Sequence, residues 1–477
     1  MLVRQVVDSK LAQFAYLVGC PRSGEALVID PERDVDRYFE EAARHNLRIV
    51  AAVDTHIHAD YLSGLREMAE RGVLVYASKE GGPDWQYEWL TDSGYPHRLL
   101  ADGDRFAVGF IEFQAVHTPG HTPEHLSYLV RDAGSGASEF IALASGDFVF
   151  VGDVGRPDLL ERAAGQVGVM VPSARAQFGS IQHAFKPLPE FLQVWPAHGA
   201  GSACGKSLGD VPTSTVGYEL RNNRSILAAS DEQTFVDFIL AGQPEPPQYF
   251  ARMKRENRRG PKLLSSLPTP QRLDADALEA LQRRLDIVVL DTRARATFAE
   301  GHLAGAILAE LDFQFCAIAG SYVDEDSPIY LLVEEIRLDE AVRALVRVGL
   351  DDVVGYVTPE TLAEFVARGG HLVRTAEIDM AHMETQRLTG KALVLDVRGG
   401  AEFAAGHVPG AIHIPHTRVR SMLETIPSDT RMLVHCNSGA RAAAAVSVLE
   451  RHGVVAYHVN DLWANYRQRA ATVDAPA

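Results

Sequence analysis

The chain has 477 residues, of which 46% are hydrophobic and 23% charged, and its formal net charge is −17 at pH 7. A chain of this length is too long for one ordinary hydrophobic core, so we expect two to four domains. The acidic balance argues against nucleic acid or an anionic membrane surface as the main partner, and no apolar run reaches the roughly 18 residues that a membrane span needs.

The first 200 residues predict strands with interspersed helices. Residues 11–19 and 25–30 are apolar runs separated by a turn signal, and residues 35–46 have helical spacing after Asp34, which we expect to be the N-cap. A further helix is predicted at 62–71. Further strands are predicted at 49–54, 73–76, 106–116, 125–130, 140–144 and 194–198. This order predicts a mixed α/β layer sandwich.

Metal-ligand residue types follow several of these strands. His56, His58 and Asp60 alternate just after the strand at 49–54, and His121 follows the stretch 106–116. Asp147 follows the strand at 140–144, and His198 ends the strand at 194–198. Neutral imidazole and carboxylate form a ligand set for transition metals. The order of these strand ends therefore predicts a metal site.

Beyond residue 250 the composition changes. Residues 252–270 are basic, contain several prolines and serines and show little apolar periodicity, so we interpret them as a linker. An internal repeat follows. The motif Asp291-Thr-Arg293 with Gly301-His302 recurs as Asp396-Val-Arg398 with Gly406-His407 at identical spacing, and each copy lies between apolar strands. The repeat predicts two α/β domains of about a hundred residues each.

The two copies differ where their second strand ends. The later copy runs into Cys436-Asn437-Ser438-Gly439-Ala440-Arg441, whereas the earlier copy has no cysteine or glycine at the equivalent place. A cysteine on a loop that opens a helix faces unpaired backbone N–H groups, which stabilise a thiolate and can hold an anion. Gly439 permits a tight loop and Arg441 adds positive charge, so we predict that Cys436 is a nucleophile.

The four cysteines are Cys20, Cys204, Cys316 and Cys436, and none forms a C-x-x-C pair. So few thiols in so long a chain favour individual roles in a reducing compartment. The first residues lack the apolar region of a secretory signal. We therefore expect a cytoplasmic protein.

The Cys436 loop, the Asp396-Val-Arg398 motif and the stretch Gly406-His407-Val408-Pro409-Gly410-Ala411 make residues 375–472 resemble a rhodanese domain. This resemblance implies a sulfurtransferase in which Cys436 carries a persulfide sulfur and Arg441 assists it. Residues 271–372 resemble the same fold without the nucleophile. That resemblance implies a structural role in spacing, docking or oligomer contacts.

Residues 1–252 resemble the αββα metallo-β-lactamase fold through the histidine and aspartate motifs described above. Dinuclear hydrolases of this fold, such as glyoxalase II, carry a histidine directly after the aspartate, where this chain has Tyr61. The arrangement of all three domains resembles the bacterial persulfide dioxygenase–rhodanese fusions. This resemblance implies one Fe(II) per chain, held by His56, His121 and Asp147.

Other residues are expected to surround that centre. His58, Asp60 and His198 would orient ligands and bound water, with His58 as a metal ligand left open. Arg156, Cys204 and Lys206 are predicted substrate-binding residues. The alternatives are an Arg156–Asp158 salt bridge in a turn and a flexible glycine-rich loop around Cys204 and Lys206.

The resemblance implies oxidation of a low-molecular-weight thiol persulfide with O2 to sulfite and thiol, coupled to sulfur transfer from Cys436 to sulfite, giving thiosulfate, in sulfide detoxification. Partners would be small molecules, with neither nucleic acid nor membrane. The thiol carrier, the direction of the transfer and a homo-oligomeric state are left open. One alternative is a dinuclear zinc thioester hydrolase with a regulatory rhodanese module. Another is a non-catalytic sulfur carrier.

Overall fold

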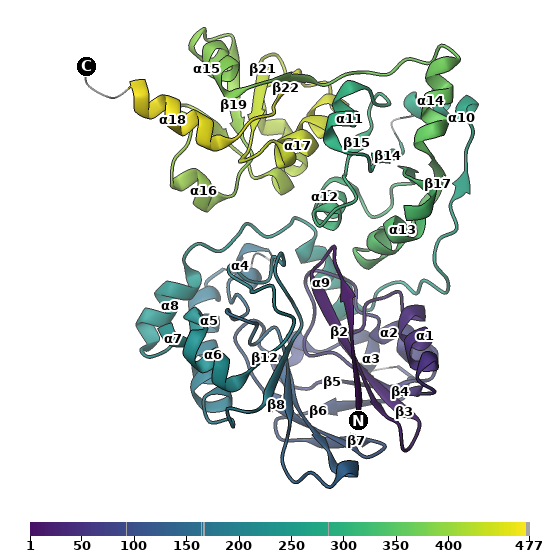
Figure 1. Cartoon of the computed structure of the whole chain (residues 1–477), viewed down its shortest axis with the longest axis vertical. Helices are drawn as coiled ribbons and strands as arrows, with labels where there is room; N and C mark the ends of the chain where they lie inside the picture. Colours follow the sequence, from purple (N-terminus) through teal and green to yellow (C-terminus); the bar gives the residue numbers. More distant parts are fainter. Residues whose placement is uncertain (92, 164, 166, 285, 474–477) are drawn as a thin grey trace. The chain divides into compact units, whose positions relative to one another are not determined.

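The computed structural model describes residues 1–91, 93–163, 165, 167–284 and 286–473. The chain divides into two compact units (Figure 1). The N-terminal unit comprises Met1–Ser266 with Val346–Gly349, and the C-terminal unit comprises Leu267–Leu345 and the residues from Leu350 on. No helix in the described part of the chain is long and apolar enough to cross a membrane.

The first sheet of the N-terminal unit contains, in spatial order, β1 (Leu2–Asp8), β2 (Gln13–Cys20), β3 (Glu25–Ile29), β4 (Arg48–Val53), β5 (Leu74–Ser78) and β6 (His97–Leu100). β1 to β3 are antiparallel, and β3 to β6 are parallel. Helices α1 (Asp36–Arg44) and α2 (Leu65–Glu70) confirm the two predicted helices within a few residues. The N-cap prediction was wrong, because α1 begins after Val35 without a side-chain cap.

The second sheet has the order β12 (Ser214–Thr215), β11 (Gln193–Pro196), β10 (Ala142–Gly146), β9 (Leu126–Asp132), β8 (Ile111–His117) and β7 (Arg105–Val108). The alternating stretch 106–116 therefore forms two strands rather than one. Gly109 makes this hairpin possible, because it has a φ of 57° and an added Cβ would lie 2.1 Å from Ser23 Oγ.

Helices cover the outer faces of the two sheets in four layers, which confirms the predicted αββα sandwich. Tyr38 and Met68 of α1 and α2 pack on the first sheet, while Phe185 and Phe235 pack on the second. The helices beyond β5 are α3 (Glu88–Thr91), α4 (Leu159–Arg162), α5 (Met170–Ser180), η3 (Ile181–Phe185), α6 (Val216–Asn222), α7 (Arg224–Ala228), α8 (Glu232–Leu240) and α9 (Phe250–Arg259), with short turns η1 (Pro83–Trp85) and η2 (Ala133–Ser135).

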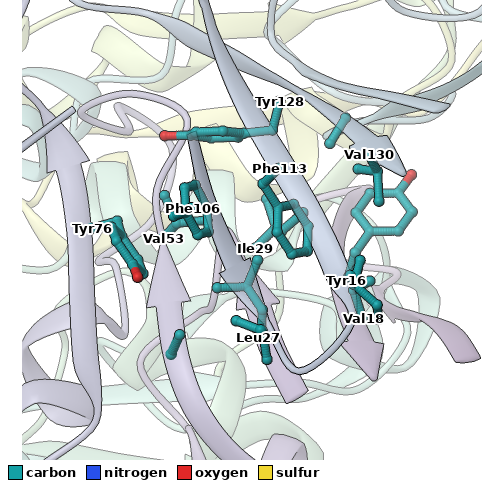
Figure 2. Packing of buried hydrophobic residues seen from close by; sticks show 14 of the residues in the cluster. Tyr16, Val18, Leu27, Ile29, Val53, Tyr76, Phe106, Phe113, Tyr128 and Val130 are labelled. Carbon is teal, nitrogen blue, oxygen red and sulfur yellow. The ribbon is translucent and has the colours of Figure 1, made fainter. Parts of the chain in front are cut away.

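The main core of this unit lies between the two sheets. Alternate residues of β2 to β5 face alternate residues of β7 to β9 across it. Figure 2 shows Tyr16, Val18, Leu27, Ile29, Val53 and Tyr76 facing Phe106, Phe113, Tyr128 and Val130. The core ties together the strands whose ends carry the metal-ligand residue types.

Phe113→Ala should lower the free energy of unfolding of this unit by about 3–5 kcal/mol, the usual cost of deleting a buried aromatic ring. Phe113 is fully buried and stacks on Phe106 with ring centroids 5.0 Å apart. Urea unfolding followed by tryptophan fluorescence measures the change. Phe110→Ala, at the 42% exposed tip of the same hairpin, should cost less than about 1 kcal/mol. Equal losses for the two variants would contradict this packing.

Helix α9 corrects the predicted linker, because Phe250–Arg259 is helical and packs within the N-terminal unit. Asn257 of this helix is buried beside the histidine loop. Its Nδ2 donates to the carbonyls of His58 at 2.9 Å and Tyr61 at 2.7 Å, and its Oδ1 accepts from the Ser63 amide. The segment taken for a linker therefore fixes the loop that carries His56 and His58.

The C-terminal unit contains two parallel sheets with the same strand order. The first is β13 (Gln271–Arg272), β17 (Val353–Val357), β16 (Ile329–Leu332), β14 (Val288–Asp291) and β15 (Ile307–Leu308). The second is β18 (Ala376–Ile378), β22 (Ala456–Val459), β21 (Arg431–His435), β19 (Ala392–Asp396) and β20 (Ile412–His413). This shared order confirms the internal repeat.

Helices flank both sheets. Those of the first copy are α10 (Ala275–Gln282), α11 (Arg295–Glu300), α12 (Phe315–Tyr322), η4 (Glu335–Arg337), α13 (Leu338–Arg347) and α14 (Pro359–Ala367). Those of the second are α15 (Met380–Leu388), α16 (Gly400–Ala404), η5 (His416–Arg418), η6 (Arg420–Thr425), α17 (Ala440–Arg451) and α18 (Trp463–Val473). The predicted α/β class therefore holds for the whole chain.

Candidate functional site

Strand ends of the N-terminal unit bring the predicted metal-ligand residues together. The loop after β4 supplies His56, the loop after β8 supplies His121, and Asp147 follows β10 directly. All three side chains are buried. Gly146 allows the close approach of these loops. Its φ is 54°, and an added Cβ would lie 2.6 Å from both Thr55 Oγ1 and His125 Nε2.

His56, His121 and Asp147 form a compact group whose potential ligand atoms all lie within 4.8 Å of one another. The Oδ2 atom of Asp147 is 3.4 Å from His121 Nε2 and 3.9 Å from His56 Nε2. Two imidazoles and one carboxylate leave coordination positions open when they hold one divalent metal ion. This is the ligand set predicted from the sequence, gathered in one place.

The surroundings of this group fit a bound cation. The Nδ1 atoms of His56 and His121 are anchored by Thr55 Oγ1 and by the Arg156 carbonyl, both at 2.9 Å, so Nε2 of each ring faces Asp147. Neither carboxylate oxygen of Asp147 has a hydrogen-bond partner among the described residues. Burial raises the pKa of Asp147 to about 6 and holds the pKa of both histidines well below their usual range. A metal ion would satisfy these buried atoms.

His58 lies outside this group, although its ring centroid is 4.3 Å from that of His56. Its Nε2 is 3.2 Å from Asp30 Oδ1 and 3.0 Å from the Tyr61 hydroxyl. Burial lowers the pKa of His58, but Asp30 and Asp54 outweigh that effect and raise it to about 9. His58 therefore belongs to a second group of residues, with Asp30 and Asp54.

Asp60, His198 and Cys204 gather on the other side of Asp147. His198 Nε2 is 3.2 Å from Asp60 Oδ2 and 3.5 Å from Asp147 Oδ1. Cys204 is buried in the loop after β11 and belongs to the same group. Burial, followed by the charges of Asp60 and Asp147, raises the pKa of the Cys204 thiol well above its usual value.

The side chains of Arg156 and Lys206 make different kinds of contact. The Arg156 guanidinium is buried and forms a two-fold salt bridge with Asp158 at 2.7 and 2.8 Å, which is the alternative considered from the sequence. The Lys206 ammonium donates to the carbonyls of Phe238 and Ala241, at the end of α8. These contacts engage the Lys206 ammonium at the end of α8, and its role in substrate binding stays a prediction.

The sequence did not indicate Lys254 of α9 as a candidate site residue. Its ammonium nitrogen is buried, packs 4.6 Å from the Trp85 ring centroid and has no hydrogen-bond partner in the described part of the chain. Burial lowers the pKa of Lys254 to about 8, while the charges of Glu124, Cys204 and Asp147 oppose that shift. The sequence offered only a basic run as a signal, and a basic run more often marks a solvated surface.

In the C-terminal unit, Cys436 follows β21 and is buried in the loop that opens α17. Its Sγ accepts from the Gly439 amide at 3.2 Å, and Gly439 has a φ of 90°. Arg441 forms a two-fold salt bridge with Glu402 at 2.7 and 2.8 Å. Cys436 and Arg441 thus lie together at a helix N-terminus, as the sequence predicted.

Two family models match parts of this chain. The model for the metallo-beta-lactamase superfamily matches residues 9–186, and the model for the rhodanese-like domain matches residues 380–467. A solved metallo-beta-lactamase structure from Staphylococcus aureus subsp. aureus COL is 37% identical, with a TM-score of 0.67. The match covers 75% of this chain and 99% of that one.

Curated relatives of two activities match this chain about equally well. The mitochondrial persulfide dioxygenase ETHE1 of Bos taurus is 27% identical over 42% of this chain and 68% of its own length. A hydroxyacylglutathione hydrolase of Actinobacillus pleuropneumoniae serotype 3 (strain JL03) is 26% identical over 38% of this chain. This chain spans slightly under two thirds, 65%, of that hydrolase. The chain therefore belongs to the metallo-β-lactamase superfamily and carries a rhodanese-like domain in its C-terminal unit.

Proposed function

We propose that the N-terminal unit is a non-haem Fe(II) dioxygenase that oxidises a low-molecular-weight thiol persulfide, and that Cys436 then transfers sulfur to the product. The placement of His58 carries this proposal. In the dinuclear hydrolases of this fold that histidine is a metal ligand, whereas here it is bound to Asp30 and Tyr61. The remaining group of two histidines and one carboxylate is the ligand set of non-haem Fe(II) oxygenases.

The overall reaction is RSSH + O2 + H2O → RSH + SO3²⁻ + 2H⁺. Fe(II) held by His56, His121 and Asp147 would activate O2 beside the electron-rich terminal sulfur. The protein fixes both rings through Thr55 and the Arg156 carbonyl, so that little reorganisation is needed when substrate binds. Burial of the whole group limits the access of bulk water to the reacting sulfur.

An adjacent cavity supports an anionic substrate. It has a volume of about 350 Å³ and is lined by Ile57 of the histidine loop, Trp85 and basic residues of α9, including Lys254. Acidic residues also line this cavity, and one of them, Glu88, pairs with Arg258 at 2.7 Å. We infer that the Lys254 ammonium, which has no hydrogen-bond partner among the described residues, holds an anionic group of the thiol persulfide.

The rhodanese-like domain supplies the second reaction. The thiolate of Cys436 attacks the terminal sulfur of a second persulfide, which releases RSH after protonation and leaves Cys436 as a persulfide. Sulfite then attacks the outer sulfur, giving thiosulfate and restoring the thiolate. The backbone N–H groups at the start of α17 and the Arg441 guanidinium favour these anions. The two reactions together suit sulfide detoxification in the cytoplasm.

A zinc-dependent thioester hydrolase is the second candidate, because the hydroxyacylglutathione hydrolases match at about the same identity as the persulfide dioxygenases. Tyr61 counts against it, since a tyrosine stands where those enzymes have a metal-binding histidine. The bonds of His58 to Asp30 and Tyr61 also count against it, because the first metal would lose a ligand.

Anaerobic purification, metal analysis and O2 uptake with glutathione persulfide test the proposal. We expect about one iron per chain and one sulfite formed for each O2 consumed when sulfur transfer is blocked. Hydrolysis of a glutathione thioester without any O2 uptake would instead establish the hydrolase.

A further inference from the structure

The loop of Cys436 is held by residues in and directly after β22. The Trp463 amide donates to the Asn437 carbonyl at 2.9 Å. Nε2 of His458, a residue that is only 1% exposed, lies 2.8 Å from the Gly439 carbonyl. A carbonyl oxygen can only accept, so Nε2 carries a proton and donates it. The imidazole is therefore bonded to the residue whose amide donates to Cys436 Sγ.

Gly439 is bonded through both of its backbone groups. Its carbonyl accepts from His458 and from the Ala443 amide at 2.9 Å, and its own amide donates to Cys436 Sγ at 3.2 Å. The φ of Gly439 is 90°, and an added Cβ would lie 2.7 Å from the Asn460 side-chain oxygen. A change at the carbonyl of this glycine therefore also changes the position of the amide that faces the sulfur.

Glu377 of β18 fixes the orientation of the His458 ring. Its Oε1 lies 2.8 Å from His458 Nδ1, and the two residues are paired in the register of the sheet. A proton must lie between these two atoms, because two lone pairs at that distance would repel each other. The Asn460 side chain donates to the same oxygen at 3.2 Å. The ring is thus bonded on both sides and cannot rotate without losing one of these bonds.

The first copy, which has no cysteine after its central strand, has different residues at both positions. Its sheet register places Tyr356 at the position of His458. Arg272 takes the position of Glu377. In that copy Tyr356 and Arg272 contact Glu335 of η4, at 3.3 and 2.9 Å. These strand positions hold the following loop in both copies, but only in the second do they fix a glycine beside a cysteine.

We propose that His458 is a positioning residue for sulfur transfer by Cys436, and that Glu377 sets the orientation of its ring. This inference rests on the proposed role of Cys436 as the sulfur carrier. The Gly439 amide stabilises the negative charge of the Cys436 thiolate. His458 acts on the sulfur through Gly439, because it holds this amide in the geometry that the thiolate needs before it attacks.

Alkylation of Cys436 by iodoacetamide tests this role without any turnover. The full chain would be labelled at neutral pH, and the labelled Cys436 peptide would be quantified by mass spectrometry. His458→Leu removes the donor to Gly439 and should slow the labelling by about 5–10-fold, the effect of losing one hydrogen bond. The kcat for thiosulfate formation should fall to the same extent, with KM changed less than about 2-fold, since the groups that bind the substrate remain.

Three further variants separate the hydrogen bond from packing. His458→Gln keeps an N–H group near the position of Nε2 and should recover most of the labelling rate. His452→Leu is the matched control, because His452 follows the opposite end of α17 and its Nδ1 contacts the Val448 carbonyl at 2.7 Å. It should label at the natural rate. Glu377→Ala covers the case that His458→Leu does not fold, and it should slow labelling by about 2–3-fold.

A natural labelling rate in His458→Leu, or no recovery in His458→Gln, would overturn the proposal. The result is also distinguishable from a failure of the proposed function. If the natural protein formed no thiosulfate while labelling still depended on His458, sulfur transfer would be excluded and the positioning of Cys436 by His458 would stand.

Discussion

His121→Ala is expected to abolish persulfide-dependent O2 uptake and to remove most of the bound iron. The substitution deletes one of two imidazoles that face Asp147 Oδ2, the nearer one at 3.4 Å. A carboxylate and one imidazole do not hold Fe(II) against competing buffer ligands. Even changes in groups that only orient metal ligands usually cost 10–100-fold, so we expect O2 uptake to fall by more than about 100-fold. Oxygen-electrode rates and iron analysis of the same preparation measure both effects.

His117→Ala is the matched control for this prediction. His117 ends β8, and its Nε2 lies 2.8 Å from the Pro123 carbonyl, so it belongs to the same loop but not to the His56 group. This variant should retain its iron and most of its O2 uptake. If His121→Ala kept the iron content and rate of the natural protein, the group of His56, His121 and Asp147 would not be the iron site.

The group of His56, His121 and Asp147 could be predicted because each of its members lies within a few residues of a strand end. The ends of β4, β8 and β10 are fixed by apolar residues that must enter the core, so the next polar residues have little freedom of position. His58 shows the limit of this reasoning. It has the same spacing and residue type as His56, yet Asp30, 28 residues earlier in the sequence, pairs with it and turns it away. Such pairing depends on which loops meet in three dimensions.

Residues from distant segments explain most of what the sequence did not show. Asn257 reaches the histidine loop from α9, and Lys254 of the same helix packs against Trp85. The sequence did not reveal this helix, because it lies in a basic stretch with few apolar residues. Lys206 and Cys204 lie in one glycine-rich loop and gave the same sequence signal. The structure separates them, because Cys204 joins Asp60 and His198 while Lys206 binds the end of α8. The direction of a loop side chain is not encoded in residue type or spacing.

The repeat in the C-terminal unit shows a different relation between sequence and structure. Arg293 and Arg398 make the same contacts, to the preceding aspartate at 2.6 Å and to a glycine carbonyl at 2.9 and 2.8 Å respectively. These shared contacts explain why the motif predicts the fold in both copies. They do not predict chemistry, because only the loop after β21 carries a cysteine. Fold and activity therefore depend on different residues of the same domain.

Cys436→Ser is expected to leave O2 uptake intact and to change the product from thiosulfate to sulfite. Serine has the shape of cysteine, but its hydroxyl cannot carry a sulfane sulfur, so no persulfide forms on the loop. Sulfite made by the N-terminal unit then has no sulfur donor on the chain. Separation of the products by chromatography should show thiosulfate falling by at least about 100-fold, while sulfite rises to match the O2 consumed.

Cys316→Ser separates this effect from a general loss of structure. Cys316 is buried within helix α12 of the same unit, with its Sγ 3.6 Å from the Ala344 carbonyl. This variant should still form thiosulfate.

If Cys436→Ser also continued to form thiosulfate enzymatically, sulfur transfer would occur elsewhere on the chain, and the Cys204 thiol beside Asp147 would become the first alternative. If O2 uptake fell in step with thiosulfate, the two activities would be coupled rather than consecutive. The ratio of sulfite to O2 decides between these outcomes, because the equation for the dioxygenase requires one sulfite per O2 when nothing consumes it.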